Sequence, residues 1–204
     1  SRAGSTAKVI MVSEPVGLLT TLFVAESGMD RRQVMGLGGV LDSTRLRYLI
    51  AQELQVTTEN VQATVIGRHS DAMIPLPRYC TVSGVPVSQL LPGDRLESLF
   101  EETRNAGNLI VDMAQRASSY YGPSAAATEL AQAINMNTGR IMSVSMVLDG
   151  EYGIEDAAMS LPAVIGRNGI EQVMLPKLSE AEQKQLTASA ENLKSIMKSA
   201  GGKK

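Results

Sequence analysis

Two short apolar runs near the start of the chain constrain its fold more than any other feature. Lys8–Val12 (KVIMV) is continuous and of strand length, which suits a strand buried on both faces, as in a parallel sheet. Gln33–Leu37 is a second short strand pattern, and the segment between them carries a helical apolar stripe, Leu18–Phe23, that ends near Gly28. A strand–helix–strand unit is too small to stand as a sheet, so further strands must lie beside it.

The remainder of the chain alternates helical and strand patterns without an internal repeat. Strands are predicted at Val61–Ile66 and Arg140–Leu148, and a glycine turn joins an expected antiparallel hairpin of Met159–Ile165 and Ile170–Met174. Helices are predicted at Asp42–Leu54, Leu96–Ala117, Ser124–Ile134 and Ser179–Ser199. The order therefore indicates a short βαβ piece followed by a mixed α+β body.

Local signals refine two of these helices. The pattern of Leu96–Ala117 is interrupted at Asn105–Gly107, where we expect a kink. Ser179 and Glu182 have the spacing of a capping box at the start of the last helix. Gly201 is expected to end that helix.

Composition excludes several classes of function. The 204 residues carry a formal net charge of −2, so the sequence lacks the excess of basic residues that is typical of nucleic-acid-binding proteins. No apolar run approaches the roughly 20 residues that span a bilayer, and no secretory signal precedes the first strand. The single cysteine, Cys80, rules out an internal disulfide, and no cysteine–histidine spacing predicts a metal site. A reducing cytoplasm is the expected compartment, with neither nucleic acid nor membrane as a partner.

Three residues could carry chemistry together. Asp42 and Arg45 lie three positions apart at a predicted helix start and so share a face. The guanidinium of Arg45 can hold a carboxylate through two parallel hydrogen bonds. His69, the only histidine, follows a predicted strand, where α/β proteins place reactive groups. An acid beside a histidine raises its pKa by stabilising the imidazolium, so the set suits proton transfer on a substrate that carries a carboxylate.

A simpler interpretation of the same residues stays open at this point. Asp42 has the residue type of a helix N-cap, and Arg45 that of a surface ion-pair partner. A lone histidine such as His69 is more often structural than catalytic. Spacing alone does not decide between the two interpretations.

Several longer segments resemble one enzyme family. The chain resembles the C-terminal part of the NAD-dependent malate/lactate dehydrogenases, and most of all the lactate-dehydrogenase-like malate dehydrogenases. The resemblance runs from about Lys8 to Ser199 and is carried by GVLDSTRLR (Gly39–Arg47), VIGRHSDAMIPLPRYCTVSGVPV (Val65–Val87), TRNAGNLIV (Thr103–Val111), SSYYGPSAAA (Ser118–Ala127) and LDGEYGIEDAAMSLPAVIGRNGIEQVM (Leu148–Met174).

The resemblance implies a fold and a division of the chain. The fold would be α/β to α+β: a C-terminal dehydrogenase domain of mixed helices and antiparallel strands, preceded by the last βαβ piece of a Rossmann sheet. Residues 1–41 would be the remnant of the dinucleotide-binding domain, and residues 42–204 the substrate domain.

The resemblance also implies roles for the site residues. His69 would be the general acid/base that takes the hydroxyl proton of a 2-hydroxy acid and returns it to the 2-keto acid in reverse. Asp42 would orient His69, and Arg45 would bind the carboxylate of malate or oxaloacetate. Ser119 falls where the family lines its substrate pocket.

The cofactor side of the site departs from the family pattern. Val12, Ser13 and Glu14 fall where the family has a strand end that reads Asn-Pro and touches nicotinamide and substrate. Glu14 replaces the asparagine, so its carboxylate would face the substrate carboxylate held by Arg45. The loop after the histidine has Ser70 where the family usually has glycine, and a positive φ there would strain a serine.

The sequence holds no G-x-G-x-x-G after a strand, the motif that binds a dinucleotide diphosphate; Gly36–Gly39 is the nearest match and lacks its third glycine. The intact family enzyme would use NAD, but this chain alone is expected to bind NAD weakly and to be inactive. The alternative is a dehydrogenase-derived domain reused for binding or assembly within a larger protein. In either case an unpaired edge at Lys8–Val12 favours self-association or contact with another domain.

Overall fold

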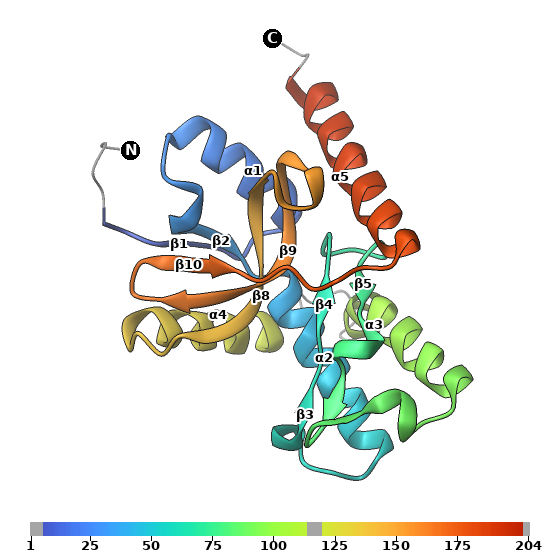
Figure 1. Cartoon of the computed structure of the whole chain (residues 1–204). Helices are drawn as coiled ribbons and strands as arrows, with labels where there is room; N and C mark the ends of the chain where they lie inside the picture. The colour runs from blue at the N-terminus through green and yellow to red at the C-terminus, as the bar shows by residue number, and fades with distance from the viewer. Residues whose placement is uncertain (1–5, 114–119, 202–204) are drawn as a thin grey trace.

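A computed structural model of the chain describes residues 6–113 and 120–201. Its centre is a five-stranded sheet in the order β1-β2-β8-β9-β10. These strands are Val9–Met11, Val34–Gly36, Arg140–Asp149, Glu155–Gly166 and Gly169–Val173. Figure 1 shows α1 (Val16–Ser27) and α4 (Tyr121–Asn135) on opposite sides of this sheet, while residues 38–113 extend from it and form a second body beside it.

The helices and the smaller strands complete the fold. The helices are α1 (Val16–Ser27), α2 (Gly38–Glu53), α3 (Gly93–Met113), α4 (Tyr121–Asn135) and α5 (Glu180–Gly201). The second body holds two small sheets, one formed by β3 (Val61–Gln62), β6 (Thr81–Val82) and β7 (Val85–Pro86), the other by β4 (Val65–Ile66) and β5 (Ile74–Pro75).

The predicted strand–helix–strand unit is confirmed. β1 pairs with β2 in parallel, with Val9 opposite Val34 and Met11 opposite Gly36. β2 then pairs antiparallel with β8, with Gly36 opposite Ser145, which joins the unit to the rest of the sheet. β1 is therefore an edge strand, as expected. The division at residues 41 and 42 stays a prediction; α2 spans that position.

Side chains of different size occupy the two faces of the sheet. Along β8, Met142, Val144 and Met146 alternate with Ser143 and Ser145. The register of β8 with β9 continues this division, because Met159 and Leu161 lie opposite Met146 and Val144, and Ser160 lies opposite Ser145. The large side chains form a buried core with α4. The small side chains on the other face let helices approach the sheet closely.

Helix α2 connects two hydrophobic clusters. At its start, Leu37 and Val40 belong to the cluster around the large sheet. Farther along, Leu46 and Ile50 belong to a second cluster with the first half of α3. Because Asp42 and Arg45 lie between these apolar positions, the two clusters place both charged side chains at their junction.

The structure corrects three of the predicted elements. α2 begins at Gly38 rather than at Asp42. Val61–Ile66 is not one strand, because its halves, β3 and β4, pair with the different partners β6 and β5. α3 runs unbroken through Asn105–Gly107, so the helix is not interrupted where a kink or local irregularity was expected, and residues 114–117 of the predicted helix lie outside the described residues.

The other element predictions are confirmed. β9 and β10 form the antiparallel hairpin, with β9 beginning earlier than expected. α4 begins three residues before Ser124. α5 is helical up to Gly201, the last residue that the structure describes, so the expected end of the helix there stays a prediction. The capping box is present, because Ser179 N donates to Glu182 Oε2 at 2.7 Å and Glu182 N donates to Ser179 Oγ at 3.3 Å.

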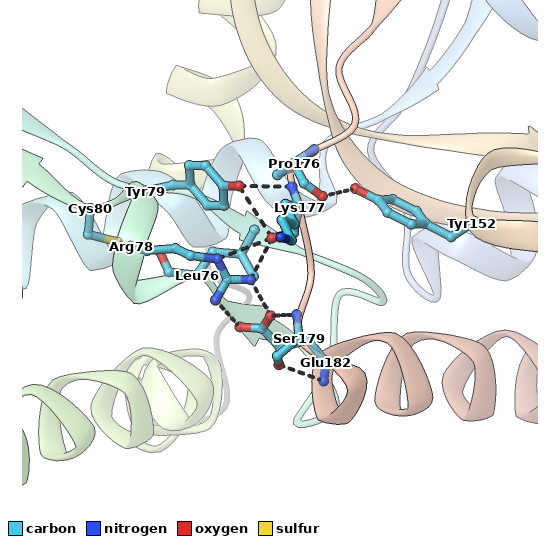
Figure 2. A network of polar contacts seen from close by, with 9 residues as sticks. All are labelled: Leu76, Arg78, Tyr79, Cys80, Tyr152, Pro176, Lys177, Ser179 and Glu182. Carbon is cyan, nitrogen blue, oxygen red and sulfur yellow. Dashed lines mark hydrogen bonds and ion pairs between the residues drawn. The ribbon is translucent and has the colours of Figure 1, made fainter.

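A polar network fixes the start of α5 against the chain that follows β5 (Figure 2). Arg78 Nε and Nη2 donate to the carbonyl oxygen of Lys177 at 3.1 and 2.6 Å, and Arg78 also binds the carboxylate of Glu182. Lys177 N donates to Tyr79 Oη at 2.8 Å, and Tyr152 Oη donates to Pro176 O at 2.5 Å. We call Arg78, Tyr79, Tyr152, Lys177 and Glu182 the α5 anchor.

Residues 6–113 and 120–201 contain no helix that is both long enough and apolar enough to cross a bilayer.

Candidate active site

The site depends on how closely α2 approaches the sheet. A Cβ on Gly39 would lie 2.5 Å from Ser143 Oγ and 2.8 Å from Ser160 Cβ, and one on Gly38 would lie 2.7 Å from Ser160 Oγ. Gly39 N also donates to Ser160 Oγ at 2.9 Å. Glycines on the helix and serines on the strands therefore let α2 start directly on the sheet. One turn later its buried face presents Asp42.

Hydrogen bonds also tie the segment that carries His69 to α2 and to the large sheet. Val65 N donates to Ser43 Oγ of α2 at 3.1 Å, and Ser143 Oγ donates to Val65 O at 2.6 Å. Two residues later, Gly67 and Ser160 exchange backbone hydrogen bonds of 2.9 and 2.8 Å. These bonds hold the chain on both sides of β4, so the position of His69 follows from that of α2 and β9.

His69 and Asp42 meet in a buried hydrogen bond. His69 Nδ1 lies 2.7 Å from Asp42 Oδ2, and the side chains are 15% and 2% exposed. A carboxylate can only accept, so Nδ1 carries the hydrogen and Nε2 is the ring nitrogen left to exchange a proton. This contact holds the ring in one orientation and tautomer.

Arg45 is the third residue of the buried set, and its guanidinium keeps unused hydrogen-bond donors. Its Nη1 lies 3.7 Å from Asp42 Oδ1, an ion-pair distance that is too long for a hydrogen bond. Asp42 Oδ1 is buried and has no hydrogen-bond partner among the described residues. The Arg45 side chain is only 15% exposed, and Asp42 is the one described residue that pairs with its guanidinium. It therefore retains hydrogen-bond donors that a bound carboxylate could use.

Glu14 reaches the free nitrogen of His69 from a distant part of the chain. Its Oε1 lies 3.3 Å from His69 Nε2, and its Oε2 accepts a hydrogen bond of 3.0 Å from Val16 N. The Glu14 side chain is 59% exposed. The carboxylate thus stands at the open side of the imidazole, where a substrate oxygen would have to lie.

The surroundings of His69 favour its charged form. Burial, the largest single influence, lowers the pKa of His69, but the hydrogen bond to Asp42 and the charges of Asp42 and Glu14 together outweigh it. The net effect is a pKa above the ordinary value. Burial lowers the pKa of Arg45, against the opposing charges of Asp42 and Glu14, but an arginine so placed still keeps its proton.

The remaining predicted site residues have different outcomes. Val12 and Ser13 are exposed at the carboxyl end of β1, in the loop that carries Glu14. Ser70 does not have a positive φ; its Oγ accepts from Ala72 N at 3.1 Å and so closes a turn. The strain expected for a serine at this position is therefore absent. Ser119 lies outside the described residues.

The simpler interpretation of the charged residues is wrong in two respects. The residue before α2 is Leu37, so Asp42 is not an N-cap, and Arg45 is not a surface residue. The sequence analysis also missed the serines that position the site. Their signal was present: small polar residues alternate at Ser143 and Ser145, and a Gly-Gly pair, Gly38-Gly39, precedes a helical pattern.

These observations define a mixed α/β domain with a buried acid–histidine–arginine site, and comparisons with known proteins agree. The model of the lactate/malate dehydrogenase alpha/beta C-terminal domain matches residues 39–203. The chain belongs to the lactate/malate dehydrogenase family. The resemblance and the predicted fold class are therefore confirmed.

Similar proteins come from archaea and bacteria. A malate dehydrogenase of Methanosarcina barkeri is 41% identical over 93% of this chain and 62% of its own length. The solved malate dehydrogenase structure from Salinibacter ruber is 40% identical with a TM-score of 0.89, and covers 93% of this chain and 62% of that one. The Aeropyrum pernix structure is 35% identical with a TM-score of 0.91, and covers 96% and 65%. The chain thus spans about three fifths of these relatives.

Proposed function

We propose that this chain supplies the proton-transfer and carboxylate-binding half of a malate dehydrogenase site, which interconverts malate and oxaloacetate with NAD. The observation that carries the proposal is the 2.7 Å bond from His69 Nδ1 to Asp42, with Arg45 beside the same carboxylate. The names of the relatives support malate as the substrate.

His69 would move the proton through Nε2. When a 2-hydroxy acid is oxidised, the neutral ring takes the hydroxyl proton; in reverse, the imidazolium returns it to the keto oxygen. Asp42 stabilises the imidazolium and prevents the ring from turning its protonated Nδ1 toward the substrate. The raised pKa of His69 favours the protonated form, which is the form needed for reduction of a keto acid.

Arg45 would hold the carboxylate next to the reacting carbon. The Arg45 side chain is largely buried beside Asp42 on the same helix, so the pairing geometry is set before a ligand arrives. Two parallel hydrogen bonds to one carboxylate would fix the ligand orientation as well as its charge.

The described residues fit one end of the cofactor. NAD, when bound, supplies the acceptor for the hydride. Val12 and Ser13 are exposed beside Glu14 at the carboxyl end of a parallel strand, the place where α/β sheets bind such ligands. The sequence offers no glycine-rich loop for the diphosphate, so we expect weak binding of NAD by the chain alone and no useful turnover.

Oxidation of L-malate with NAD by the full-length gene product tests the proposal. We expect activity that His69→Asn lowers at least about a hundredfold. A second test replaces the matching segment of the Salinibacter ruber enzyme with this chain; its activity should also depend on His69. Activity that survives His69→Asn in both proteins would contradict the assignment.

A second candidate function rests on Glu14. Its carboxylate occupies the open side of His69, as expected if a dehydrogenase-derived site had been reused for binding. Activity that appears only after Glu14→Asn in an otherwise inert full-length protein would favour this candidate.

Self-association is a separate proposal. β1 is an edge of the sheet, and Val12 at its end is 46% exposed. An unpaired edge offers backbone hydrogen bonds to another strand. Static light scattering of the chain should show dimers or larger species, and a monomer at high concentration would contradict this proposal.

A further inference from the structure

Four charged groups meet at the site, and their signs set what it can bind. Arg45 is a cation, and Asp42 and Glu14 are anions that both lie within ion-pair distance of the His69 ring. When His69 is protonated, the two cations balance the two anions. When His69 is neutral, the group has an excess of one negative charge. Counted over the described residues, the site thus has no net positive charge in either state of His69.

A 2-hydroxy or 2-keto acid fits this balance less well, although the hydroxyl group of a 2-hydroxy acid can donate one hydrogen bond to Glu14. Its carboxylate pairs with Arg45 but adds a negative charge to a group that is neutral or already negative. A keto oxygen accepts hydrogen bonds but cannot donate them, and the same is true of the Glu14 carboxylate beside it. Two acceptors that face each other repel, and neither gains a hydrogen bond in place of the one that it made with water.

A 2-amino acid fits it well. Its carboxylate would pair with Arg45, and its ammonium, at the position of the hydroxyl group, has three donors to share. Glu14 Oε1 and a neutral His69 Nε2 would both accept from it. The α-carboxylate and the ammonium bring one charge of each sign, so this part of the ligand preserves the balance in either protonation state of His69.

The Glu14 carboxylate is free to make this contact. Its 3.3 Å distance to His69 Nε2 is longer than the 2.7–2.9 Å typical of a strong charged hydrogen bond. The bond from Val16 N holds only Oε2 and leaves Oε1 directed at the site. An ammonium could therefore take the place of the imidazole contact without unfolding any element.

We propose that Glu14 makes this site select 2-amino acids over the 2-hydroxy and 2-keto acids with the same carbon skeleton. The inference rests on the proposed function, because Arg45 and His69 hold the ligand in both cases. The inference goes beyond the proposed function because it names Glu14 as the residue that distinguishes ligands by the group on carbon 2.

L-aspartate and L-malate form a matched pair of probes, since they differ only in the ammonium or hydroxyl group at carbon 2. Because His69 is the only histidine, its imidazole NMR signals report binding without ambiguity. We expect the 204-residue chain to bind L-aspartate about tenfold more tightly than L-malate, a modest factor because the Glu14 side chain is 59% exposed.

Two variants separate the role of Glu14 from a general effect of charge. Glu14→Gln should remove or reverse the preference for L-aspartate. Glu26→Gln removes the same charge from an exposed position on α1 and should leave the preference intact. Arg45→Gln should weaken both ligands, because both use the guanidinium.

The outcomes distinguish this inference from the proposed function. Equal affinity of the two ligands, a preference that survives Glu14→Gln, or no response of the imidazole to either ligand would overturn the inference. If L-malate binding still depends on Arg45 in the first two cases, or if malate oxidation by the full-length protein still depends on His69 in the third, the proposed function stands. If L-malate binds but Arg45→Gln leaves its affinity unchanged, both fail.

Discussion

The α5 anchor and the active site use the same kinds of residue in opposite ways. In the anchor, three nitrogens of Arg78 donate to Lys177 O and the Glu182 carboxylate, and Ser179 N–H donates to the same carboxylate. In the active site, Arg45 makes one ion pair of 3.7 Å, and Asp42 Oδ1 accepts no hydrogen bond from a described residue.

The difference teaches how to tell a structural network from a binding site. In the anchor, the Arg78 guanidinium and the Glu182 carboxylate are both paired, and they lie at a surface where ion pairs contribute little. The active site is more deeply buried yet keeps unused hydrogen-bonding capacity, which is costly unless a ligand completes it. Unsatisfied buried groups beside a histidine therefore mark the function better than the number of polar contacts does.

Replacing His69, the proposed proton carrier, should have the largest effect. His69→Asn deletes the titrating group but can still donate to Asp42, so the fold should survive. Malate oxidation by the full-length protein should fall by about 10²–10⁴-fold. Arg78→Lys in the anchor is the matched control and should leave kcat/KM within about twofold of the wild type. Equal losses in the two variants would break the comparison.

The close contact under α2 should be the next most sensitive feature. In Gly39→Ala the new methyl group would lie 2.5 Å from Ser143 Oγ, so α2 must move away from the sheet. We expect a loss of about 1–3 kcal/mol in the free energy of unfolding, together with altered imidazole NMR signals of His69.

Gly93→Ala is the control for this change. Gly93 begins α3, and a Cβ there would meet nothing within 4 Å. Urea unfolding of both variants provides the measurement. A stable Gly39→Ala protein with unchanged His69 signals would show that the close packing does not set the geometry of the site.

The pH dependence of stability tests the charge pairing at His69. Because the folded-state pKa lies above the ordinary value of 6.5, protonation stabilises the fold; the gain is complete below about pH 6.5 and is lost as the pH rises through the higher folded-state pKa. Asp42→Asn should lower the pKa, since burial then dominates, and should remove this gain.

NMR titration of the single histidine, together with unfolding at about pH 5.5 and pH 8.5, measures both effects. Glu182→Gln in the anchor should leave the histidine titration unchanged. A wild-type His69 pKa at or below 6.5 would be the contrary result.

The smallest effect should come from the cap of α5. Ser179→Ala removes the hydroxyl that accepts from Glu182 N, and we expect a loss of about 0.5–1 kcal/mol in the free energy of unfolding with unchanged malate oxidation. Ser195→Ala, an exposed serine within the same helix, should cost less, because alanine is a better helix former. Lost activity in Ser179→Ala would mean that the anchor and the site are coupled.

Local sequence signals were sufficient for much of the fold. The apolar runs, the hairpin turn and the capping box depend on residues that are neighbours in the chain, and each is present. The signals failed where partners from elsewhere decided the outcome. Val61–Ile66 looks like one strand, but β6 pairs with its first half and β5 with its second.

What the sequence determined by itself was the kind of chemistry available. It held one histidine, an acid and an arginine spaced to share a helix face, and a glutamate where the family has an asparagine. Their charges and hydrogen-bonding capacities belong to the residues, and no packing is needed to know them.

Only the tertiary structure decided how these groups are used. Close packing of Gly38 and Gly39 on strand serines turns Asp42 inward, and the parallel strand β1 brings Glu14 to the open nitrogen of His69. Both contacts join segments far apart in the chain, so no local propensity encodes them; they follow from side-chain size at the sheet and from strand order.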